Sequence, residues 1–465
     1  MVIDENRKAI LWSGIEKIGV YLANFTIQII LARLLCPNDY AVVAMLAIFF
    51  SISQAFIDSG FHTTLIQRQD CTQEDYSTVF YFNVVLGFIV YLLFYILSPY
   101  IENLYEFKGL AKVTKVYSLN LLINSFSMVH RAMLTKNLEF KKIAIITFLS
   151  SVLSAIPAII LAYLDFGYWS LVIQSLLSTL VLTLMTIYQS KWKPTFVFSL
   201  DSLRKLAPFG IKMLLIYLFH AMYNNIYPLL IGMKFPSRDL GFYDRAKTLS
   251  SMGPVGFSDF YTRALYPIQA KSQNDDSILQ NSYNKSFSII CIAIIPITAY
   301  LFHFSEETVY TLFGTQWMEC SWIIKYLTLG YMLYPLQALN MNMLKVRGYG
   351  SVMLYAEIIK KAVGIICVIV LINYDFQYVV IGWASCALFD FIISEVFYFK
   401  KYGFSLWPSC KVLLTNIIIT FILALGVSSI IKILFDSFYS RFFIGGALFL
   451  LMYICVNYKR IKLIL

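Results

Sequence analysis

Residues 191–205, with the sequence KWKPTFVFSLDSLRK, form a basic segment between two similar halves of the chain. The pairs RK at 7–8 and GI at 14–15 recur at 204–205 and 210–211, which are 197 and 196 residues later. The pattern DFxY at 165–168 recurs at 375–378, and Lys115 recurs as Lys325, both 210 residues later. Matches that keep the same order along the chain indicate an internal duplication, in which each copy contains several helices.

The composition is that of a polytopic membrane protein. Of the 465 residues, 59% are hydrophobic and only 14% are charged, and the mean hydropathy is +0.71. A soluble domain cannot bury so much apolar surface. Apolar runs of about 20 residues, the length that a helix needs to cross a bilayer, recur along the chain. They begin near residues 10, 40, 77, 115, 143 and 168, then near 211, 247, 283, 321, 352 and 377, and finally near 412 and 442.

These runs predict an all-α membrane protein with about 14 transmembrane helices. Two parallel six-helix bundles are expected at 1–190 and 211–401, joined by a cytoplasmic basic linker at 191–210, with two further helices at 402–465. The first run has no cleavage site behind it and is expected to remain as a helix. Loops on the side of the two termini hold about twice as many lysines and arginines as the opposite loops, which predicts cytoplasmic termini. Rocking of two such bundles would open a path to alternate sides, as in a transporter.

Several other classes of protein are disfavoured. The net charge of +11 follows mostly from the loop bias and does not indicate nucleic-acid binding. The eight cysteines have no paired spacing and the four histidines stand far apart, so neither disulfides nor a metal site are predicted. The sequence contains no Walker phosphate loop and no loop as large as a catalytic domain, which excludes direct ATP hydrolysis. No cofactor is expected.

Polar residues on the first helix of each copy predict a water-filled path. A charged side chain that faces lipid costs about 2.5–3.5 kcal/mol, so these residues should face the seam between the bundles. The alternative is that the charged ones reach the cytoplasmic headgroups. The first copy carries Lys17, Asn24 and Gln28, and the second carries Lys212, His220, Asn224 and Asn225.

A motif follows the second apolar run. It has the form DxGxxxxLIQRxD at 58–70 and continues as EDxSTxF at 74–80. In it, Gly60 permits a tight exit from a helix, and Asp58 can bond amides or pair with Arg68. Arg68 could hold a phosphate through two hydrogen bonds. The alternative is a structural turn that carries a cytoplasmic positive charge.

This motif resembles the Wzx-like lipopolysaccharide and polysaccharide biosynthesis flippases of the multidrug/oligosaccharidyl-lipid/polysaccharide exporter superfamily. Three further segments are similar: LARLLxP at 31–37, which contains Arg33, FGxWSLV at 166–172, and LGxYxRA at 240–246, which contains Tyr243 and Arg245. Gln73 departs from the family, where an acidic residue is common at this position.

The resemblance implies a fold like that of the MATE and MurJ transporters and a function without covalent chemistry. An undecaprenyl-pyrophosphate-linked oligosaccharide would move from the cytoplasmic to the periplasmic leaflet of the bacterial inner membrane, for O-antigen, capsule or exopolysaccharide synthesis. The resemblance also implies a cationic central cavity for the pyrophosphate and sugars.

The residues predicted to meet the substrate are polar or basic and lie at the seam or near helix ends. Arg131 and Arg263 could meet an incoming pyrophosphate at the cytoplasmic side, and Lys325 could line the periplasmic mouth or else snorkel to the headgroups. The whole set is Lys17, Asn24, Arg68, Arg131, Lys212, Arg263 and Lys325.

Two carboxylates are candidates for ion coupling. Asp390 lies about ten residues, or about 15 Å along a helix, from the basic end at Lys400. Glu357 is four residues from Lys361, and a self-neutralising pair is the alternative reading of these two.

Two other functions stay open. A drug or metabolite exporter of the same superfamily would favour an acidic cavity, against which Lys17 and Lys212 argue. A membrane glycosyltransferase or polymerase would share the composition, but the longest outer loops, near 100–114 and 234–247, are short. The expected partners are the lipid-linked oligosaccharide, membrane lipids, and a polysaccharide polymerase with its chain-length regulator. A monomer is expected, because two bundles already enclose a path.

Overall fold

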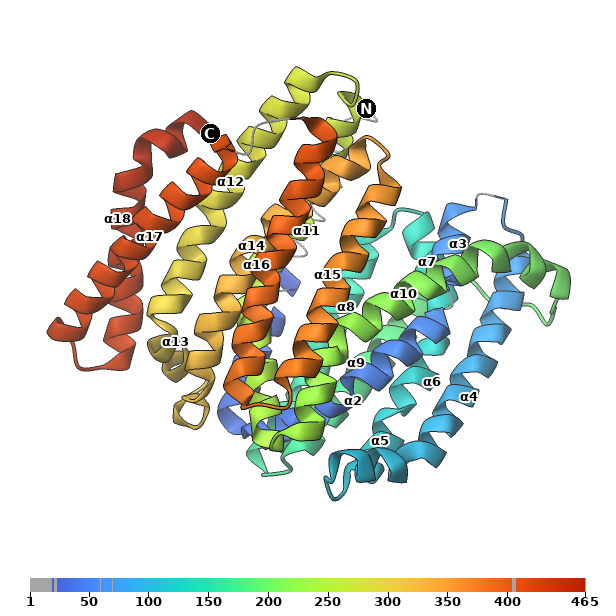
Figure 1. Ribbon diagram of the computed structural model, residues 1–465. Helices are drawn as coiled ribbons and strands as arrows, with labels where there is room; N and C mark the ends of the chain where they lie inside the picture. The colour runs from blue at the N-terminus through green and yellow to red at the C-terminus, as the bar shows by residue number, and fades with distance from the viewer. Residues whose placement is uncertain (1–18, 21–22, 59, 69, 404–406, 465) are drawn as a thin grey trace. The chain divides into compact units, whose positions relative to one another are not determined.

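The computed structural model describes residues 19–20, 23–58, 60–68, 70–403 and 407–464 (Figure 1). All regular structure in these ranges is helical, and no strand occurs among them. Nine of the described helices are long and apolar enough to cross a membrane. The prediction of an all-α multi-pass membrane protein is therefore confirmed, whereas the number of about 14 crossings stays a prediction.

The chain forms two compact units, an N-terminal unit up to Gly241 and a C-terminal unit from Phe242 onward. The two predicted sequence copies meet at 191–210, which is a different boundary from that between the compact units. This duplication stays a prediction. The helix that begins the second predicted copy, α10 (Leu200–Lys234), packs within the N-terminal unit against α2 (Pro37–Asp58). The described part of the predicted linker is helical from Leu200 onward.

The N-terminal unit contains a described helix at Ala23–Leu34 and nine labelled helices. In this unit α2 contacts α4, α6, α9 and α10, and α8 packs along α9. The helices other than α2 and α10 are α3 (Phe61–Gln67), α4 (Gln73–Tyr105), α5 (Leu110–Tyr117), α6 (Leu119–Ser125), α7 (Met128–Lys136), α8 (Phe140–Tyr163) and α9 (Tyr168–Ser190).

The run predicted as one span near Lys115 forms three short helices in succession, α5, α6 and α7. Serine hydroxyls bond backbone carbonyls at both junctions. Ser118 Oγ donates to Lys115 O at 2.9 Å, and Ser127 Oγ donates to Asn124 O at 2.9 Å. Such bonds compete with the helical ladder, and serines are common where a helix is interrupted.

The turn between α2 and α3 depends on glycine. Gly60 has a φ of 66°, and a Cβ atom there would lie 2.1 Å from the carbonyl oxygen of Gly210 in α10. Glycine is therefore required at this position for two reasons: the backbone is left-handed, and the backbone of α10 lies too close for a side chain. This contact fixes α3 against α10.

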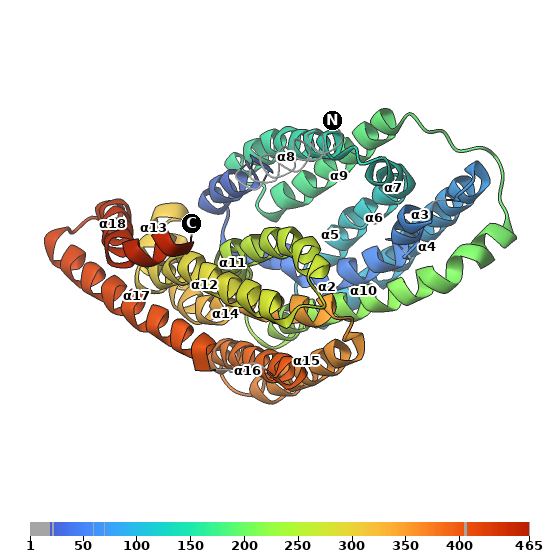
Figure 2. The same cartoon turned by 90° about the horizontal axis from the view of Figure 1, so that it is seen from above.

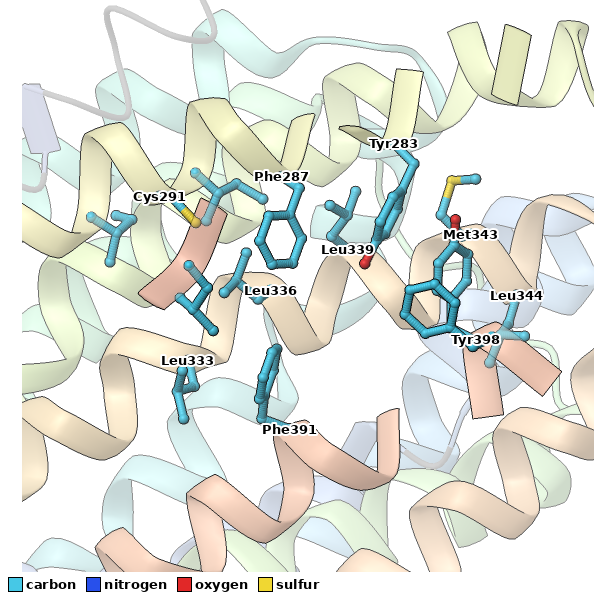
Figure 3. Close-up of a cluster of buried hydrophobic side chains, with 14 of the residues drawn as sticks. Tyr283, Phe287, Cys291, Leu333, Leu336, Leu339, Met343, Leu344, Phe391 and Tyr398 are labelled. Atoms are coloured by element: carbon cyan, nitrogen blue, oxygen red, sulfur yellow. The ribbon is translucent and has the colours of Figure 1, made fainter. Parts of the chain in front are cut away.

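The C-terminal unit is built around α14 (Cys320–Val346), which lies between α12 (Asp276–His303) and α16 (Phe376–Tyr402) (Figure 1). Its apolar core includes Phe287, Leu336 and Phe391, which point toward one another from these three helices (Figure 3). The remaining elements are α11 (Ser237–Lys271), α13 (Ser305–Leu312), a 3-10 turn at Thr315–Trp317, α15 (Gly350–Leu371), α17 (Trp407–Leu434) and α18 (Phe438–Ile464).

Candidate functional site

A pocket of about 590 Å³ lies within the N-terminal unit. Helices α2, α5, α6, α9 and α10 line it, and on α2 and α10 the lining residues recur every three or four positions, so that each helix presents one face. The volume is within the range of pockets that bind small molecules, about 300–1,000 Å³. The polar lining residues are Ser51, Gln54, Asp58, Tyr117, Asn120, Asn124, Ser175, Thr179, Tyr217, His220, Asn224 and Asn225.

The lining of this pocket is polar and largely uncharged. None of the described residues that line it is lysine or arginine, and Asp58 is its carboxyl group. Gln54 Nε2 donates to Asp58 Oδ1 at 3.2 Å, and Arg131, on α7, is near enough to Asp58 and His62 to act on both electrostatically. The pocket thus suits a ligand that is rich in hydroxyl or amide groups. It does not supply the cationic cavity that the resemblance implies, which stays a prediction.

Arg68 ends α3 and belongs to a small ionic network. Its Nε lies 3.4 Å from Asp70 Oδ1, and Lys205 Nζ lies 3.4 Å from Asp70 Oδ2. A hydrogen bond from its own backbone N–H, followed by the charge of Arg68, holds the pKa of Asp70 below its ordinary value. The carboxylate therefore stays ionised between two cations, and a phosphate that binds Arg68 has to compete with it. Among the described residues, Arg68 forms its ion pair with Asp70 and not with Asp58.

Lys136 fixes the backbone at this position. Its Nζ donates to Arg68 O at 2.5 Å and to Tyr76 Oη at 3.0 Å. The C-terminal unit has a similar arrangement, in which Arg347 Nε donates to Gln273 O at 3.2 Å and the guanidinium lies over the Tyr402 ring. In each unit a basic residue at the end of a helix thus holds a neighbouring loop.

The segment from Lys191 to Ser199 connects the end of α9 to the start of α10 without regular secondary structure (Figure 2). Trp192 Nε1 donates to Gln73 Oε1 at 2.6 Å, and Gln73 Nε2 donates to Lys193 O at 2.8 Å. Gln73 can do both because its amide has a donor and an acceptor, whereas an ionised carboxylate has acceptors only. The departure from the family pattern at this position therefore has a local structural role.

The other predicted substrate residues are dispersed. Lys17 lies outside the described residues, and the side chain of Arg263 in α11 is not among those described. Asn24 is half-buried, Lys212 and Arg131 are exposed, and none of these lines the pocket. Lys325 Nζ lies 3.1 Å from Glu306 Oε1. Of the members of the predicted substrate set that the structure describes, none lies among the pocket residues.

The family-motif residues have mixed environments. Arg33 is exposed, Tyr243 is buried with 1% of its surface exposed, and Arg245 Nη2 lies 2.8 Å from Asp244 Oδ2. Among the described motif residues, Asp58 is the one that lines the pocket.

The two predicted coupling carboxylates lie near each other in the C-terminal unit. Glu357 forms ion pairs with Lys360 and with Lys361, the latter at 3.8 Å. Asp390 is close enough to Lys360 and Glu357 to interact electrostatically, and its buried Oδ1 has no hydrogen-bond partner within the described chain. Glu357 thus pairs with Lys361, as the sequence predicted, and also with a second lysine, Lys360.

A family model described as "Polysaccharide biosynthesis protein" matches residues 30–322. This region includes the pocket and more than half of the chain. The chain belongs to this polysaccharide biosynthesis protein family.

Two proteins that resemble this chain are named for polymer synthesis. The teichuronic acid biosynthesis protein TuaB of Bacillus subtilis is 26% identical over 65% of this chain and 63% of its own length. The lipopolysaccharide biosynthesis protein WzxC of Escherichia coli is 25% identical over 66% of this chain and 63% of its own length. The match therefore spans less than two thirds of the length of these relatives.

The fold of this family member is shared with solved transporter structures. The lipid II flippase MurJ superposes with a TM-score of 0.79 at 15% identity, over 98% of this chain and all of MurJ. A multidrug resistance MATE transporter of the MOP superfamily superposes with a TM-score of 0.63 at 17% identity, over 83% of this chain and 94% of its own. The predicted MATE- and MurJ-like fold is thus confirmed.

Sequence reasoning missed a buried polar network in the C-terminal unit of this family member. Glu395 is 6% exposed, and its Oε1 accepts a hydrogen bond from Asn340 Nδ2 at 3.0 Å. Tyr283 Oη donates to Asn340 Oδ1 at 3.0 Å and stacks on Tyr398, whose ring centroid is 4.3 Å away (Figure 3). These residues come from three helices far apart in sequence, so no local pattern indicates them.

Proposed function

We propose that this protein translocates a lipid-linked oligosaccharide across the bacterial inner membrane, from the cytoplasmic to the periplasmic leaflet, for synthesis of a surface polysaccharide. The family, the names of TuaB and WzxC, and the fold shared with MurJ support this proposal. The observation that carries it is the pocket of largely uncharged hydrogen-bonding side chains inside a membrane protein. Such groups suit sugar hydroxyls better than they suit a lipid tail.

The proposed reaction has no covalent step. A pyrophosphate headgroup cannot cross hydrocarbon unaided, because burying its charges costs far more than thermal energy. A hydrated path lined by polar groups lowers this cost while the lipid tail stays in the bilayer. The basic residues predicted for the pyrophosphate remain part of the proposal: Lys17, Arg68, Arg131, Lys212, Arg263 and Lys325.

We also propose the cellular context that this function requires. Both termini face the cytoplasm, the protein acts as a monomer, and a polysaccharide polymerase with its chain-length regulator uses the product on the periplasmic side.

Deletion of the gene tests the function in the host. Lipid-linked oligosaccharides are extracted from inverted membrane vesicles and resolved by leaflet. We expect complete repeat units to accumulate on the cytoplasmic leaflet and surface polysaccharide to be lost. Incomplete units, or complete units on the periplasmic leaflet, would instead indicate an enzyme that builds or polymerises them. Normal polysaccharide together with drug sensitivity would indicate a small-molecule exporter.

Asp390 is proposed to couple transport to an ion gradient. A buried carboxylate oxygen without a hydrogen-bond partner, close to Lys360 and Glu357, is an unusual group in a membrane helix and marks a candidate ion site. The Asp390→Asn variant should transport at a rate that no longer responds to a proton or sodium gradient. The matched control is Asp375→Asn, since Asp375 is exposed at the start of the same helix. An unchanged gradient dependence in Asp390→Asn would exclude this role.

A further inference from the structure

Asn120 gives the pocket a buried hydrogen-bond acceptor. The residue lies in the wall formed by α6, with 8% of its surface exposed. Its Nδ2 donates to Tyr117 O at 2.9 Å, whereas its Oδ1 has no partner in the described chain. Buried carbonyl oxygens in folded proteins normally receive a donor from protein, water or ligand. The group that completes this site must therefore bring an N–H or an O–H.

Asp58, on α2, is a second acceptor in the pocket wall. A carboxylate accepts hydrogen bonds and has no donor when it is ionised. Gln54 supplies one donor to Oδ1, at 3.2 Å, and the carboxyl group has further acceptor capacity. Two acceptors on different helices thus face one pocket, and a ligand that carries several donors satisfies both.

The apolar part of the wall is aromatic. The rings of Phe50 and Tyr117 meet edge to face with centroids 4.5 Å apart, and both residues line the pocket. Pockets for small ligands typically combine aromatic walls with a few polar groups that fix orientation. A sugar ring has this dual character, because its hydroxyl groups lie at the edge and its C–H groups form apolar faces.

An acidic sugar does not suit this wall. Its carboxylate accepts and cannot donate, and none of the described lining residues is a lysine or arginine that would pair with it. It would also lie in the same pocket as the carboxyl group of Asp58. An unpaired charge in such a site is costly, and an ionised Asp58 would in addition repel it.

We infer that this pocket seats a neutral sugar of the substrate that offers hydroxyl or acetamido donors, and that it rejects a uronic acid at the same position. The inference rests on the proposed function, and it concerns the sugar in this subsite only. An acidic sugar elsewhere in the repeat unit is compatible with it.

Saturation-transfer NMR on the purified full-length protein tests the inference with free sugars. N,N′,N″-Triacetylchitotriose, called chitotriose below, is the neutral, acetamido-bearing probe, and trigalacturonate is the acidic probe in which every sugar carries a carboxylate. We expect chitotriose to bind at least about tenfold more tightly, equivalent to about 1.4 kcal/mol. Equal or stronger binding of trigalacturonate would overturn the inference.

Two variants assign the binding to this pocket. Asn120→Leu should weaken chitotriose binding about tenfold, whereas Asn83→Leu should not change it. Asn83 is a matched control because it is fully buried in the same unit, its side-chain amide also has no hydrogen-bond partner among the described residues, and it does not line the pocket. Asp58→Asn should reduce the discrimination against trigalacturonate and provides a second test if Asn120→Leu fails to fold. Unchanged chitotriose binding in folded Asn120→Leu, or unchanged discrimination in Asp58→Asn, would contradict the assignment.

This test separates the inference from the proposed function. The titration uses free sugars and does not require transport. Selective chitotriose binding in a protein that moves no lipid-linked oligosaccharide would remove the proposed function and keep the sugar site. Transport of lipid-linked neutral and fully acidic oligosaccharides at equal rates would keep the function and remove the selectivity.

Discussion

The Asp58→Lys variant is expected to lose export of the lipid-linked oligosaccharide almost completely, by about 100-fold or more, which corresponds to about 2.7 kcal/mol. The change removes the carboxyl acceptor that faces the pocket and places a long cation among the other lining side chains, none of which among the described residues is a lysine or arginine. It also brings a positive charge into the electrostatic range of Arg131, which now acts on the carboxyl group. Leaflet-resolved analysis of lipid-linked oligosaccharides in the deletion host measures the effect.

Two variants control for charge and for folding in this experiment. Asp201→Lys makes the same change of charge at an exposed position in the first turn of α10, outside the pocket, and should retain export. Asp58→Asn keeps an oxygen acceptor for Gln54 and should retain part of the activity. Wild-type export by Asp58→Lys, with normal amounts of protein in the membrane, would exclude the pocket from the transport path.

The Asn340→Leu variant is expected to lose about 3 kcal/mol or more of stability. Asn340 donates to Glu395 Oε1 at 3.0 Å and to Ser394 Oγ at 3.1 Å, and it accepts from Tyr283 Oη. Leucine would leave the buried Glu395 carboxyl group without its nearest donor, and the loss of one member of a buried network is costlier than removal of the whole network. Thermal unfolding of the purified protein in detergent measures the loss.

Two further variants make this prediction specific. Glu395→Gln keeps an acceptor for the Asn340 amide and should cost about 1 kcal/mol or less. Asn373→Leu, at an exposed turn between α15 and α16, should leave the unfolding temperature nearly unchanged. If Asn340→Leu unfolds at the same temperature as Asn373→Leu, the network does not stabilise the C-terminal unit.

The architecture could be predicted from the sequence because it depends on patterns that are local. Apolar runs long enough to cross a bilayer predict helices wherever they occur. The run near Lys115 shows where this reasoning ends, since it folds as the three short helices α5, α6 and α7. The serines at its junctions make hydrogen bonds of the same kind as Ser150 inside the unbroken α8. A serine within an apolar run looks the same whether its hydroxyl bends the helix or not.

The pocket was predictable in part. Asp58 was singled out by its motif, and His220, Asn224 and Asn225 by their polarity on a membrane helix, and all four line the pocket. The spacing of Ser51, Gln54 and Asp58, three and four residues apart on α2, is a signal that could have extended the set.

Asn120 and Asn124 carried no such signal, because a lone amide in an apolar run is commonly structural. The predicted basic residues did not locate the pocket, since none of the described ones lines it. Lysines and arginines of a membrane protein gather at helix ends for topological reasons, so their presence does not identify a substrate site.

The most direct test of the account is translocation by the purified protein in liposomes. A fluorescent undecaprenyl-pyrophosphate-linked neutral trisaccharide is incorporated, and a membrane-impermeant quencher reports how much of it remains in the outer leaflet over time. The account predicts rapid exchange between leaflets with the wild-type protein, and exchange with Asp58→Lys that is as slow as in liposomes without protein. Equal rates for wild-type protein, Asp58→Lys and protein-free liposomes would contradict the claim that this protein moves lipid-linked oligosaccharides.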